Sequence, residues 1–416
     1  MPDPIPTSAP TLADAPASLN MKMLFEHAAQ VGASDLLITA GSPPIVRIDG
    51  DLRRVTNQLL KPDQTHALVW SLLNETQQEQ FERKRELDFS LAVTGSLRFR
   101  ANVYYQKGAV SAAFRLIPRS VPNMTRLGLP PIMGNLTLRT HGLILLTGPT
   151  GSGKSTTCAS MVDLINETRR CHIVTVEDPI EFVHENKMSI VDQREVYADT
   201  LSFANALKYV LRQDPDVILV GEMRDVETIS AALTAAETGH LVIATLHTND
   251  AIQAIDRIVD VFPPHQQNQV RTQLAFSLIA VVAQQLIPHA DGKGRIMAAE
   301  LLIKSHAVAT HIREGKTHQT RSIMESSRAE GNITMDQRLK ELYEGGQISW
   351  EELFRRVTSP TFLHQVKRRT SPPPKPVPTA EEAELVELEE VTDDEPPVDR
   401  SQPSKLPYLR RMKKEK

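Results

Sequence analysis

The sequence predicts an α/β fold in which a parallel sheet is covered by helices on both faces. Short apolar runs bounded by glycine or polar residues recur at 142–147, 172–176, 217–220 and 241–245, and helical stretches separate them. Strands that alternate with helices in this way form parallel sheets, because each crossover helix covers one face. The length, 416 residues, corresponds to two or three domains. A smaller α+β unit is therefore expected beside the parallel sheet.

The first unit is predicted to be a small α+β domain over residues 20–117. It is expected to contain, in order, a helix over 20–31, strands over 34–39 and 45–50, a helix over 65–82, and a hairpin of strands over 97–105 and 109–117. Four prolines punctuate the stretch that follows, which places the interdomain linker at 118–131.

The unit with the parallel sheet is predicted over residues 132–287, and residues 288–369 are expected to be mainly helical. One helix is expected to end at the glycine pair 345–346. Another opens at Ser349, which forms a capping box with Glu352.

Both ends of the chain are predicted to be disordered tails, over 1–19 and 370–416. Of the 28 prolines, five lie in residues 1–18 and nine in residues 371–416, and residues 381–399 hold ten acidic side chains and no basic one. Such segments bury too little apolar surface to fold. The acidic tail is either a solubilising segment or a docking tail whose basic end, residues 410–414, contacts a membrane surface or a partner's acidic patch.

The composition excludes several classes of protein. The net charge of −4 is unlike the basic footprint of a general nucleic-acid binder. No signal peptide is recognised, and the longest apolar window, residues 275–283, is too short to cross a membrane. Two cysteines, Cys158 and Cys171, cannot form a four-ligand zinc site or a disulfide framework, and suit buried thiols in a reducing cytosol.

A phosphate-binding loop follows the first strand of the parallel sheet. Residues 148–155 fit the pattern Gly-x4-Gly-Lys-Ser, between a strand and a helix. The glycines let the backbone approach an anion, and the helix N-terminus adds a positive dipole. Lys154 is expected to contact the β- and γ-phosphates, and Ser155 to bind Mg²⁺. The predicted nucleotide-binding residues are Gly148, Pro149, Thr150, Gly151, Ser152, Gly153, Lys154, Ser155 and Thr156.

Three carboxylates follow the second strand, at Glu177, Asp178 and Glu181. Ligands of open α/β sheets bind at the carboxyl ends of the strands, so this cluster is expected beside the phosphate loop. One of the three, Glu177 by preference, is expected to polarise the attacking water.

The remaining strands also end in polar side chains. Glu222 follows strand 217–220 and is the candidate magnesium-side acid, where Gly221 replaces the usual aspartate and a contact through metal-bound water is expected. His247, after strand 241–245, is expected to sense the γ-phosphate, and His240 to be a structural or subunit-contact residue. The histidines lack the spacing of a zinc site.

Together these motifs resemble those of the secretion and type IV pilus motor ATPases. The phosphate loop and residues 177–182, 220–225 and 238–248 are similar to the Walker A motif, Asp box, Walker B motif and His box of that family. The resemblance spans about residues 21–357. Within the superfamily the chain resembles the pilus retraction ATPases, PilT and PilU, since it lacks the long N-terminal extension and four-cysteine zinc module of the assembly and secretion members.

Three stretches bear on the group within the retraction family. Residues 32–41 and 279–295 resemble PilU more closely, whereas residues 221–225 resemble PilT. Because two of the three stretches resemble PilU, the sequence predicts that the chain belongs to the PilU group. Residues 307–314 keep only the end of a stretch common in the retraction family, Ala-Ile-Arg-Asn-Leu-Ile-Arg-Glu, which leaves open whether the chain acts alone.

The resemblance implies a RecA-like ATPase core, a PAS-like first domain and a homohexameric ring. ATP would bind between the domains at subunit boundaries, where Arg100 and Arg115 would meet its phosphates, with Arg98 as the alternative to them. The implied cofactor is Mg²⁺. The implied partners are a paralogous pilus ATPase and an inner-membrane platform protein, with membrane association through these partners and no nucleic acid or zinc.

The expected function is that of a cytoplasmic ATPase motor for pilus retraction at the inner face of the cytoplasmic membrane. Two alternatives remain open. One is an ATPase for pilus extension or type II secretion. The other is an accessory ATP-binding partner of the main retraction motor.

Overall fold

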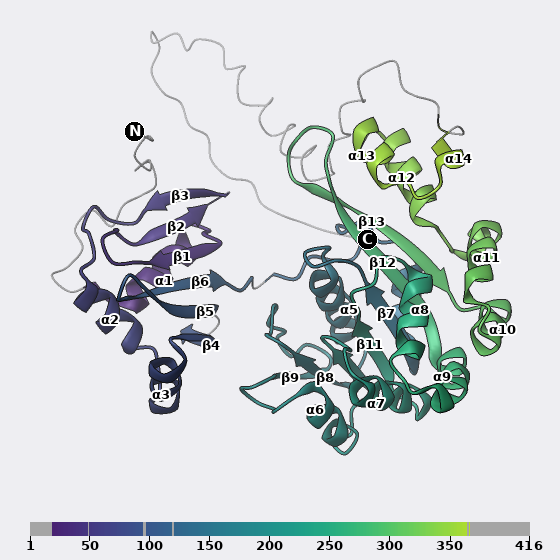
Figure 1. Ribbon diagram of the computed structural model, residues 1–416, viewed down its shortest axis with the longest axis horizontal. Helices are drawn as coiled ribbons and strands as arrows, with labels where there is room; N and C mark the ends of the chain where they lie inside the picture. The colour runs from purple at the N-terminus through teal and green to yellow at the C-terminus, as the bar shows by residue number, and fades with distance from the viewer. Residues whose placement is uncertain (1–18, 49, 95–96, 119, 364–365, 367–416) are drawn as a thin grey trace, which may run out of the picture.

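The computed structural model describes residues 19–48, 50–94, 97–118, 120–363 and 366, and these form two units joined by a linker (Figure 1). Apart from Leu19, the two predicted tails lie outside the described residues. Among the helices of the described ranges, none is both long and apolar enough to cross a membrane.

The first unit is an antiparallel sheet with the strand order β3-β2-β1-β6-β5-β4. Its core contains Phe25, whose ring lies 4.4 Å from that of Phe99 and 5.0 Å from that of Phe114. The elements are α1 (Met21–Gln30), β1 (Asp35–Ile38), β2 (Ile45–Ile48), β3 (Asp51–Arg54), α2 (Pro62–Trp70), α3 (Glu75–Lys84), β4 (Glu86–Thr94), β5 (Leu97–Gln106) and β6 (Ala109–Leu116).

The single helix expected over residues 65–82 is two helices, α2 and α3. Asn74 separates them because it caps α3: its side chain accepts a hydrogen bond from the Gln77 amide at 2.9 Å, and the Gln77 side chain accepts from the Asn74 amide at 3.0 Å. This reciprocal pair opens a helix rather than continuing one. Strands β3 and β4 also lie outside the predicted elements of this unit.

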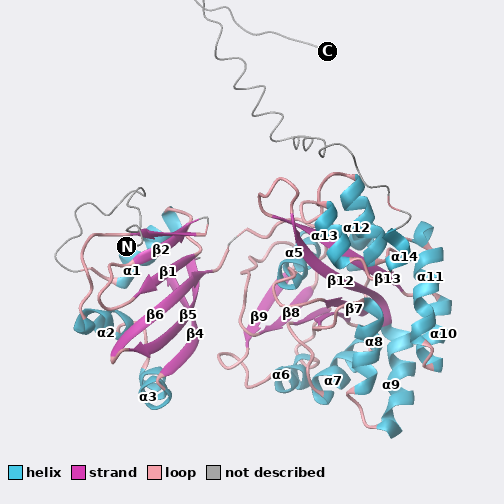
Figure 2. Ribbon diagram, turned by 45° about the horizontal axis from the view of Figure 1, so that its top comes forward, coloured by secondary structure: helices cyan, strands magenta, loops and turns pink. Residues whose placement is uncertain are grey.

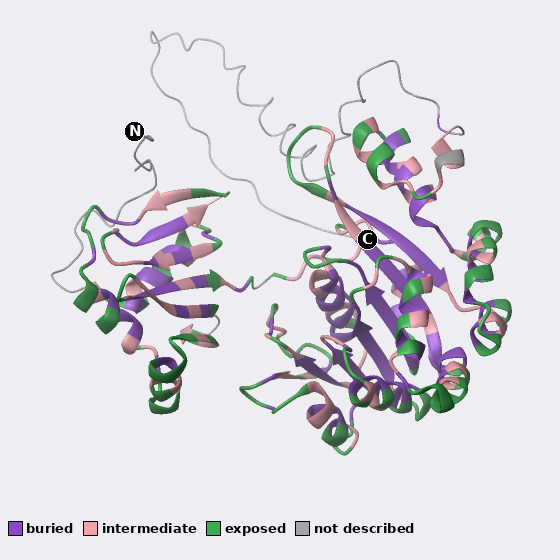
Figure 3. Ribbon diagram, in the orientation of Figure 1, coloured by how far each residue is buried: buried purple, intermediate pink, exposed green. Residues whose placement is uncertain are grey.

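The second unit is a seven-stranded sheet with the order β13-β12-β7-β11-β10-β8-β9. All neighbours are parallel except β13, which runs antiparallel to β12. The strands are β7 (Gly142–Thr147), β8 (His172–Glu177), β9 (Ile190–Glu195), β10 (Val217–Val220), β11 (Leu241–Thr245), β12 (Leu278–Pro288) and β13 (Arg295–Ile303). The central strands are buried along their whole length (Figure 3).

Helices cover both faces of this sheet (Figure 2). One face packs against α4 (Ile132–Thr137) and α5 (Lys154–Thr168). The other packs against α6 (Phe203–Val210), α7 (Val226–Glu237), α8 (Ala251–Asp260), α9 (Pro264–Ser277), α10 (His306–Glu314) and α11 (Thr320–Ser326). The C-terminal helices α12 (Met335–Glu344), α13 (Trp350–Arg356) and α14 (Pro360–Leu363) pack at the far end of the β12–β13 hairpin.

The segment after residue 287 is not mainly helical from its start, because β13 belongs to the sheet. Its alanine, methionine, glutamate and leucine residues favour a helix in isolation. In the fold, β13 pairs with β12 over its whole length and is buried on both faces, with Ala299 in one core and Leu302 in the other. Pairing and burial outweigh the intrinsic preference, so the sheet extends beyond the expected boundary.

Glu300, on β13, joins the sheet to two helices. Its carboxylate accepts hydrogen bonds from the Ala251 amide, at the start of α8, at 2.8 Å and from the Met335 amide, at the start of α12, at 3.1 Å. Burial raises the pKa of Glu300, and the two amide donors oppose that rise. The side chain thus satisfies N–H groups that these helices cannot satisfy internally.

We expect Glu300→Ala to lower the free energy of unfolding by about 1–3 kcal/mol for each buried N–H left without an acceptor. Denaturant unfolding of the purified chain measures this change. The control is Glu330→Ala, at an exposed position, which should stay within about 0.5 kcal/mol of wild type. Equal stabilities for the two variants would contradict the anchoring role of Glu300.

Candidate functional site

The predicted site residues of the second unit lie at one edge of its sheet, where four neighbouring parallel strands end. The strands β7, β11, β10 and β8 are adjacent in this order, and their registers align their carboxyl ends. The phosphate loop follows β7, His247 follows β11, Glu222 follows β10, and Glu177 ends β8. The fold therefore gathers residues that lie far apart in the sequence (Figures 1 and 2).

The phosphate loop has a backbone that requires glycine. At Gly148 the φ angle is +141°, and a Cβ atom would meet the carbonyl oxygen of Gln284 and lie 2.7 Å from Ser152 Oγ. Gly151 and Gly153 also have positive φ angles, of 77° and 90°. Helix α5 begins directly after this turn without a side-chain cap, so the free N–H groups of its first turn can bind an anion.

Lys154 is buried at the start of α5. Its Nζ donates hydrogen bonds to the carbonyl oxygens of Gly148 at 2.7 Å and Pro149 at 3.1 Å. Burial lowers the pKa of Lys154, and the negative charge of Glu222 opposes this. The loop therefore holds the ammonium group against its own backbone and close to the acid that follows β10. Ser155 and Thr156 are half-buried in the same helical turn.

Glu222 is held by two cationic or ionisable side chains. Its Oε1 accepts a hydrogen bond from Arg224 Nε and lies 3.2 Å from His247 Nε2. The neighbouring Gly221 explains why this strand ends in one acid: a Cβ there would lie 3.0 Å from the carbonyl oxygen of Val176. An aspartate at 221 would crowd the end of β8, so Glu222 alone supplies the carboxylate of this strand end.

Glu177, the last residue of β8, is half-buried. Its Oε1 accepts hydrogen bonds from Thr175 Oγ1 at 2.6 Å and Gln193 Nε2 at 3.1 Å. Burial raises the pKa of Glu177, while both hydrogen bonds act in the opposite direction. A carboxylate with a raised pKa is a better proton acceptor near neutral pH. Sequence reasoning did not identify Gln193, whose role depends on the pairing of β9 with β8.

The arginines of the first unit lie on one row of its sheet. Arg100 on β5 is directly opposite Arg115 on β6, which is directly opposite Asp35 on β1. Arg115 Nε donates to Asp35 Oδ1 at 3.0 Å, and Arg47 lies 3.8 Å from the same carboxylate. Like charges directly opposite each other are unfavourable, and Asp35 offsets part of the positive charge of this exposed row. Asp35 and Arg47 can be found only from the strand register.

Arg98 and Arg100 interact with acids of the second unit, whereas Arg115 makes its ion pair within the first unit. Arg98 Nη2 donates to Glu195 Oε2 at 3.0 Å. Burial raises the pKa of Asp178, and the charge of Arg100 is the largest influence that opposes the rise. Arg98 thus contacts the end of β9, and Arg100 lies on the same strand face, as strand alternation predicts.

The other singled-out residues have structural contacts. The His240 ring lies 3.0 Å from the Ala235 carbonyl oxygen at the end of α7. Cys158 is buried, which raises the pKa of its thiol, and Cys171 Sγ lies 3.2 Å from Ser189 Oγ. In the described part of the chain, no group of three His, Cys, Asp or Glu side chains is placed to hold a metal ion.

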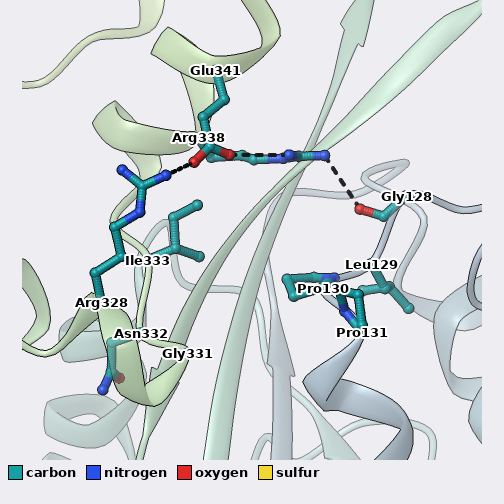
Figure 4. A pocket seen from close by; sticks show the side chains of 10 residues that line it. All are labelled: Gly128, Leu129, Pro130, Pro131, Arg328, Gly331, Asn332, Ile333, Arg338 and Glu341. Atoms are coloured by element: carbon teal, nitrogen blue, oxygen red, sulfur yellow. Dashed lines mark hydrogen bonds and ion pairs between the residues drawn. The ribbon is translucent and has the colours of Figure 1, made fainter.

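A separate pocket of about 300 Å³ lies between the linker and the C-terminal helices (Figure 4). Arg328 and Arg338 both contact Glu341, and Arg338 Nη2 donates to the Gly128 carbonyl oxygen at 3.3 Å. The pocket shares no lining residue with the strand-end site, and its arginines are already paired. The hydrogen bond from Arg338 to Gly128 joins α12 to the linker.

Comparisons with known proteins agree with the fold and the motifs. The family model described as type II/IV secretion system protein matches residues 12–363. The type IV pilus retraction ATPase PilT of Pseudomonas aeruginosa is 48% identical over 80% of this chain and 96% of that protein. A crystal structure of the pilus retraction motor PilT with bound ADP has a TM-score of 0.77 at 49% identity, covering 84% of this chain and all of that one. The predicted α/β fold with a RecA-like core is confirmed.

The comparison with PilU bears on the predicted group. The type IV pilus ATPase PilU of Pseudomonas aeruginosa is 41% identical over 83% of this chain and 90% of that protein. Both paralogues are thus relatives, as the motifs predict. The identity is higher to PilT than to PilU, so the comparison over the whole length does not support the prediction of the PilU group from the short stretches.

We expect the ionisation of the Glu177 carboxyl to set the acid limb of the pH profile of ATP turnover. Glu177→Gln should keep nucleotide affinity and lose turnover by about 100-fold or more, because an amide cannot accept the proton. Gln193→Leu removes a donor to the charged carboxylate, which raises the pKa of Glu177 further and moves the acid limb to higher pH. Steady-state ATP turnover of both variants, measured against pH, checks these expectations. If the acid limb does not move in Gln193→Leu, a group other than Glu177 sets it.

Proposed function

Because the chain belongs to the type II/IV secretion system family of P-loop ATPases, we propose that it is a hexameric motor that hydrolyses ATP to power type IV pilus retraction. The observation that carries the proposal is the 48% identity to the retraction ATPase PilT over 96% of that protein's length. The strand-end site, which retains each motif residue, supports it. The two cysteines of the sequence cannot form the four-cysteine zinc module of the assembly members, which favours retraction over extension or secretion.

The reaction is transfer of the γ-phosphoryl group of ATP to water. The N–H groups of residues 150–153 and the start of α5 would surround the phosphates, and Lys154 would exchange its loop carbonyls for phosphate oxygens. Glu177 would orient and deprotonate the attacking water, for which its raised pKa suits it. His247 would report the γ-phosphate to Glu222 through their 3.2 Å contact.

Ser155 and Glu222 would hold Mg²⁺. A hydroxyl and a carboxylate are oxygen donors of the kind that this ion prefers, and both residues follow strands that end at the same edge of the sheet. When bound, the ion supplies positive charge against the phosphate oxygens. Arg224 and His247 already contact one oxygen of Glu222, which supports a contact to Mg²⁺ through water.

The arginine row would complete the site when the two units approach each other. The charge of Arg100 already acts on the pKa of Asp178, and Arg115 would leave Asp35 for a phosphate in its own subunit or a neighbouring one. A guanidinium brought in by closure stabilises the transition state and couples hydrolysis to movement. We place the ring in the cytoplasm, at the inner face of the membrane, bound to a platform protein and a paralogous ATPase.

Lys154→Ala should abolish retraction in cells that lack the wild-type gene, because it removes the cation that faces the transferred phosphoryl group. Such cells should carry excess surface pili and not twitch, whereas wild-type and Lys84→Ala complementation should restore both properties. Lys84 is exposed on α3, outside the site. Bald cells would indicate extension, and normal pili would indicate an accessory subunit.

Arg115→Ala should leave ADP affinity near normal and lower turnover strongly. In mixed rings, one mutant subunit should impair its wild-type neighbours, so activity should fall more steeply than the mutant fraction. Titration of the variant into wild-type rings measures this. A proportional decline, or none, would reject a site shared across the boundary and leave Arg115 as a surface arginine worth about 0.5 kcal/mol of stability or less.

A further inference from the structure

Two side chains of strand β9 form hydrogen bonds with the loop that follows β8. The Gln193 side chain donates to the Phe182 carbonyl oxygen at 2.8 Å and accepts from the His184 amide at 2.8 Å. Gln193 Nε2 also donates to Glu177 Oε1, at 3.1 Å. Two residues further along β9, Glu195 Oε2 accepts a hydrogen bond from the Ile180 amide at 3.3 Å. The backbone of the loop that begins at Glu177 is therefore held by two side chains of one strand.

Glu195 also contacts the first unit. Its Oε2, the oxygen that accepts from Ile180, accepts from Arg98 Nη2 at 3.0 Å. The Glu195 side chain is 6% exposed and that of Arg98 is 27% exposed, and Arg98 Nε is buried without a hydrogen-bond partner. Because Glu195 is buried and Arg98 is only partly exposed, losing Arg98 leaves the Glu195 carboxylate without its compensating charge.

We propose that Arg98 and Glu195 are positioning residues for ATP hydrolysis: their ion pair transmits the position of the first unit to the loop that carries Glu177. The inference rests on the proposed role of Glu177. One carboxylate oxygen receives both the guanidinium and the loop amide, so a shift of Arg98 moves the acceptor of Ile180. Arg98 therefore serves the reaction through the loop, and Arg100, on the same strand face, is the arginine near Asp178.

The geometry distinguishes this role from simple attachment of the two units. A contact that only attaches them needs opposite charges at positions 98 and 195, in either order. Positioning of the loop needs in addition an acceptor at 195 for the Ile180 amide. Exchanging the charges, as in Arg98→Glu/Glu195→Arg, keeps the first property and removes the second, because a guanidinium has no acceptor.

Steady-state ATP turnover of the full-length chain tests the proposal. Arg98→Ala should lower kcat by about tenfold or more, since small displacements of a catalytic group are costly, while the Kd for ADP changes by less than about threefold. Arg98→Lys should recover part of kcat because it keeps the charge. Arg98→Ala/Glu195→Gln should be no slower than the slower single variant, since both changes remove one interaction.

The matched control is Arg83→Ala, which removes an exposed arginine of α3 in the same unit and should keep wild-type kcat. Thermal melting identifies unfolded variants, and Glu195→Gln, which retains an acceptor for Ile180, provides a second folded test. Wild-type kcat in Arg98→Ala, additive losses in the double variant, or full recovery by the charge exchange would each overturn the proposal. Absence of turnover in the wild-type chain would instead contradict the proposed motor.

Discussion

The phosphate loop depends on the close approach of two backbones, at Gly148 and Gln284. Because Gly148 has no side chain, the chain leaving β7 can pass against the carbonyl group of its neighbour β12. The Gln284 side chain, fully buried, donates to Thr157 Oγ1 in α5 at 2.8 Å. Gln284 thus contacts both parts of the site: its carbonyl group leaves no room for a side chain at position 148, and its side chain binds α5. The pairing of β12 with β7 therefore sets the position of the α5 N-terminus.

This constraint extends to the C-terminal helices through β13. Strand β13 pairs with β12, and its Glu300 accepts the first amides of α8 and α12. At the opposite side of β7, Thr147 Oγ1 accepts from the Thr248 amide at 2.8 Å, which fixes the segment just after His247. The site is therefore held on one side by β12 and β13, which carry no nucleotide-binding motif, and on the other by the contact between β7 and the segment that follows β11.

Charge distribution gives the two units complementary edges. The sheet of the first unit presents an arginine row with one compensating acid, Asp35, and the strand ends of the second present Asp178, Glu195 and Glu222. Arg98 already contacts Glu195, and Arg100 lies on the same strand face. Arg100 and Arg115 lie side by side, an arrangement that is unfavourable until an anion lies between the units. In the proposed mechanism, such a pair would make the relative position of the units sensitive to a bound phosphate.

The sequence by itself determined the class of the fold, the phosphate loop and the four strand ends that carry Lys154, Glu177, Glu222 and His247. These features are local: a buried parallel strand reads as an apolar run, and a loop of glycines before a helix has few other interpretations. The helix cap at Asn74 could also be recognised from the sequence, although the helical spacing of apolar residues over 65–82 favoured a single helix.

Only the tertiary structure decided the strand β13, the support of Glu177 by Gln193, and the partners of Arg98 and Arg115. Each depends on which strands are neighbours and in what register, and these pairings join residues as far apart as Arg98 and Glu195. Residue type and spacing show that an arginine lies on a strand face. They do not show what lies opposite it, because the energy of a buried contact depends on both partners and on the solvent excluded around them.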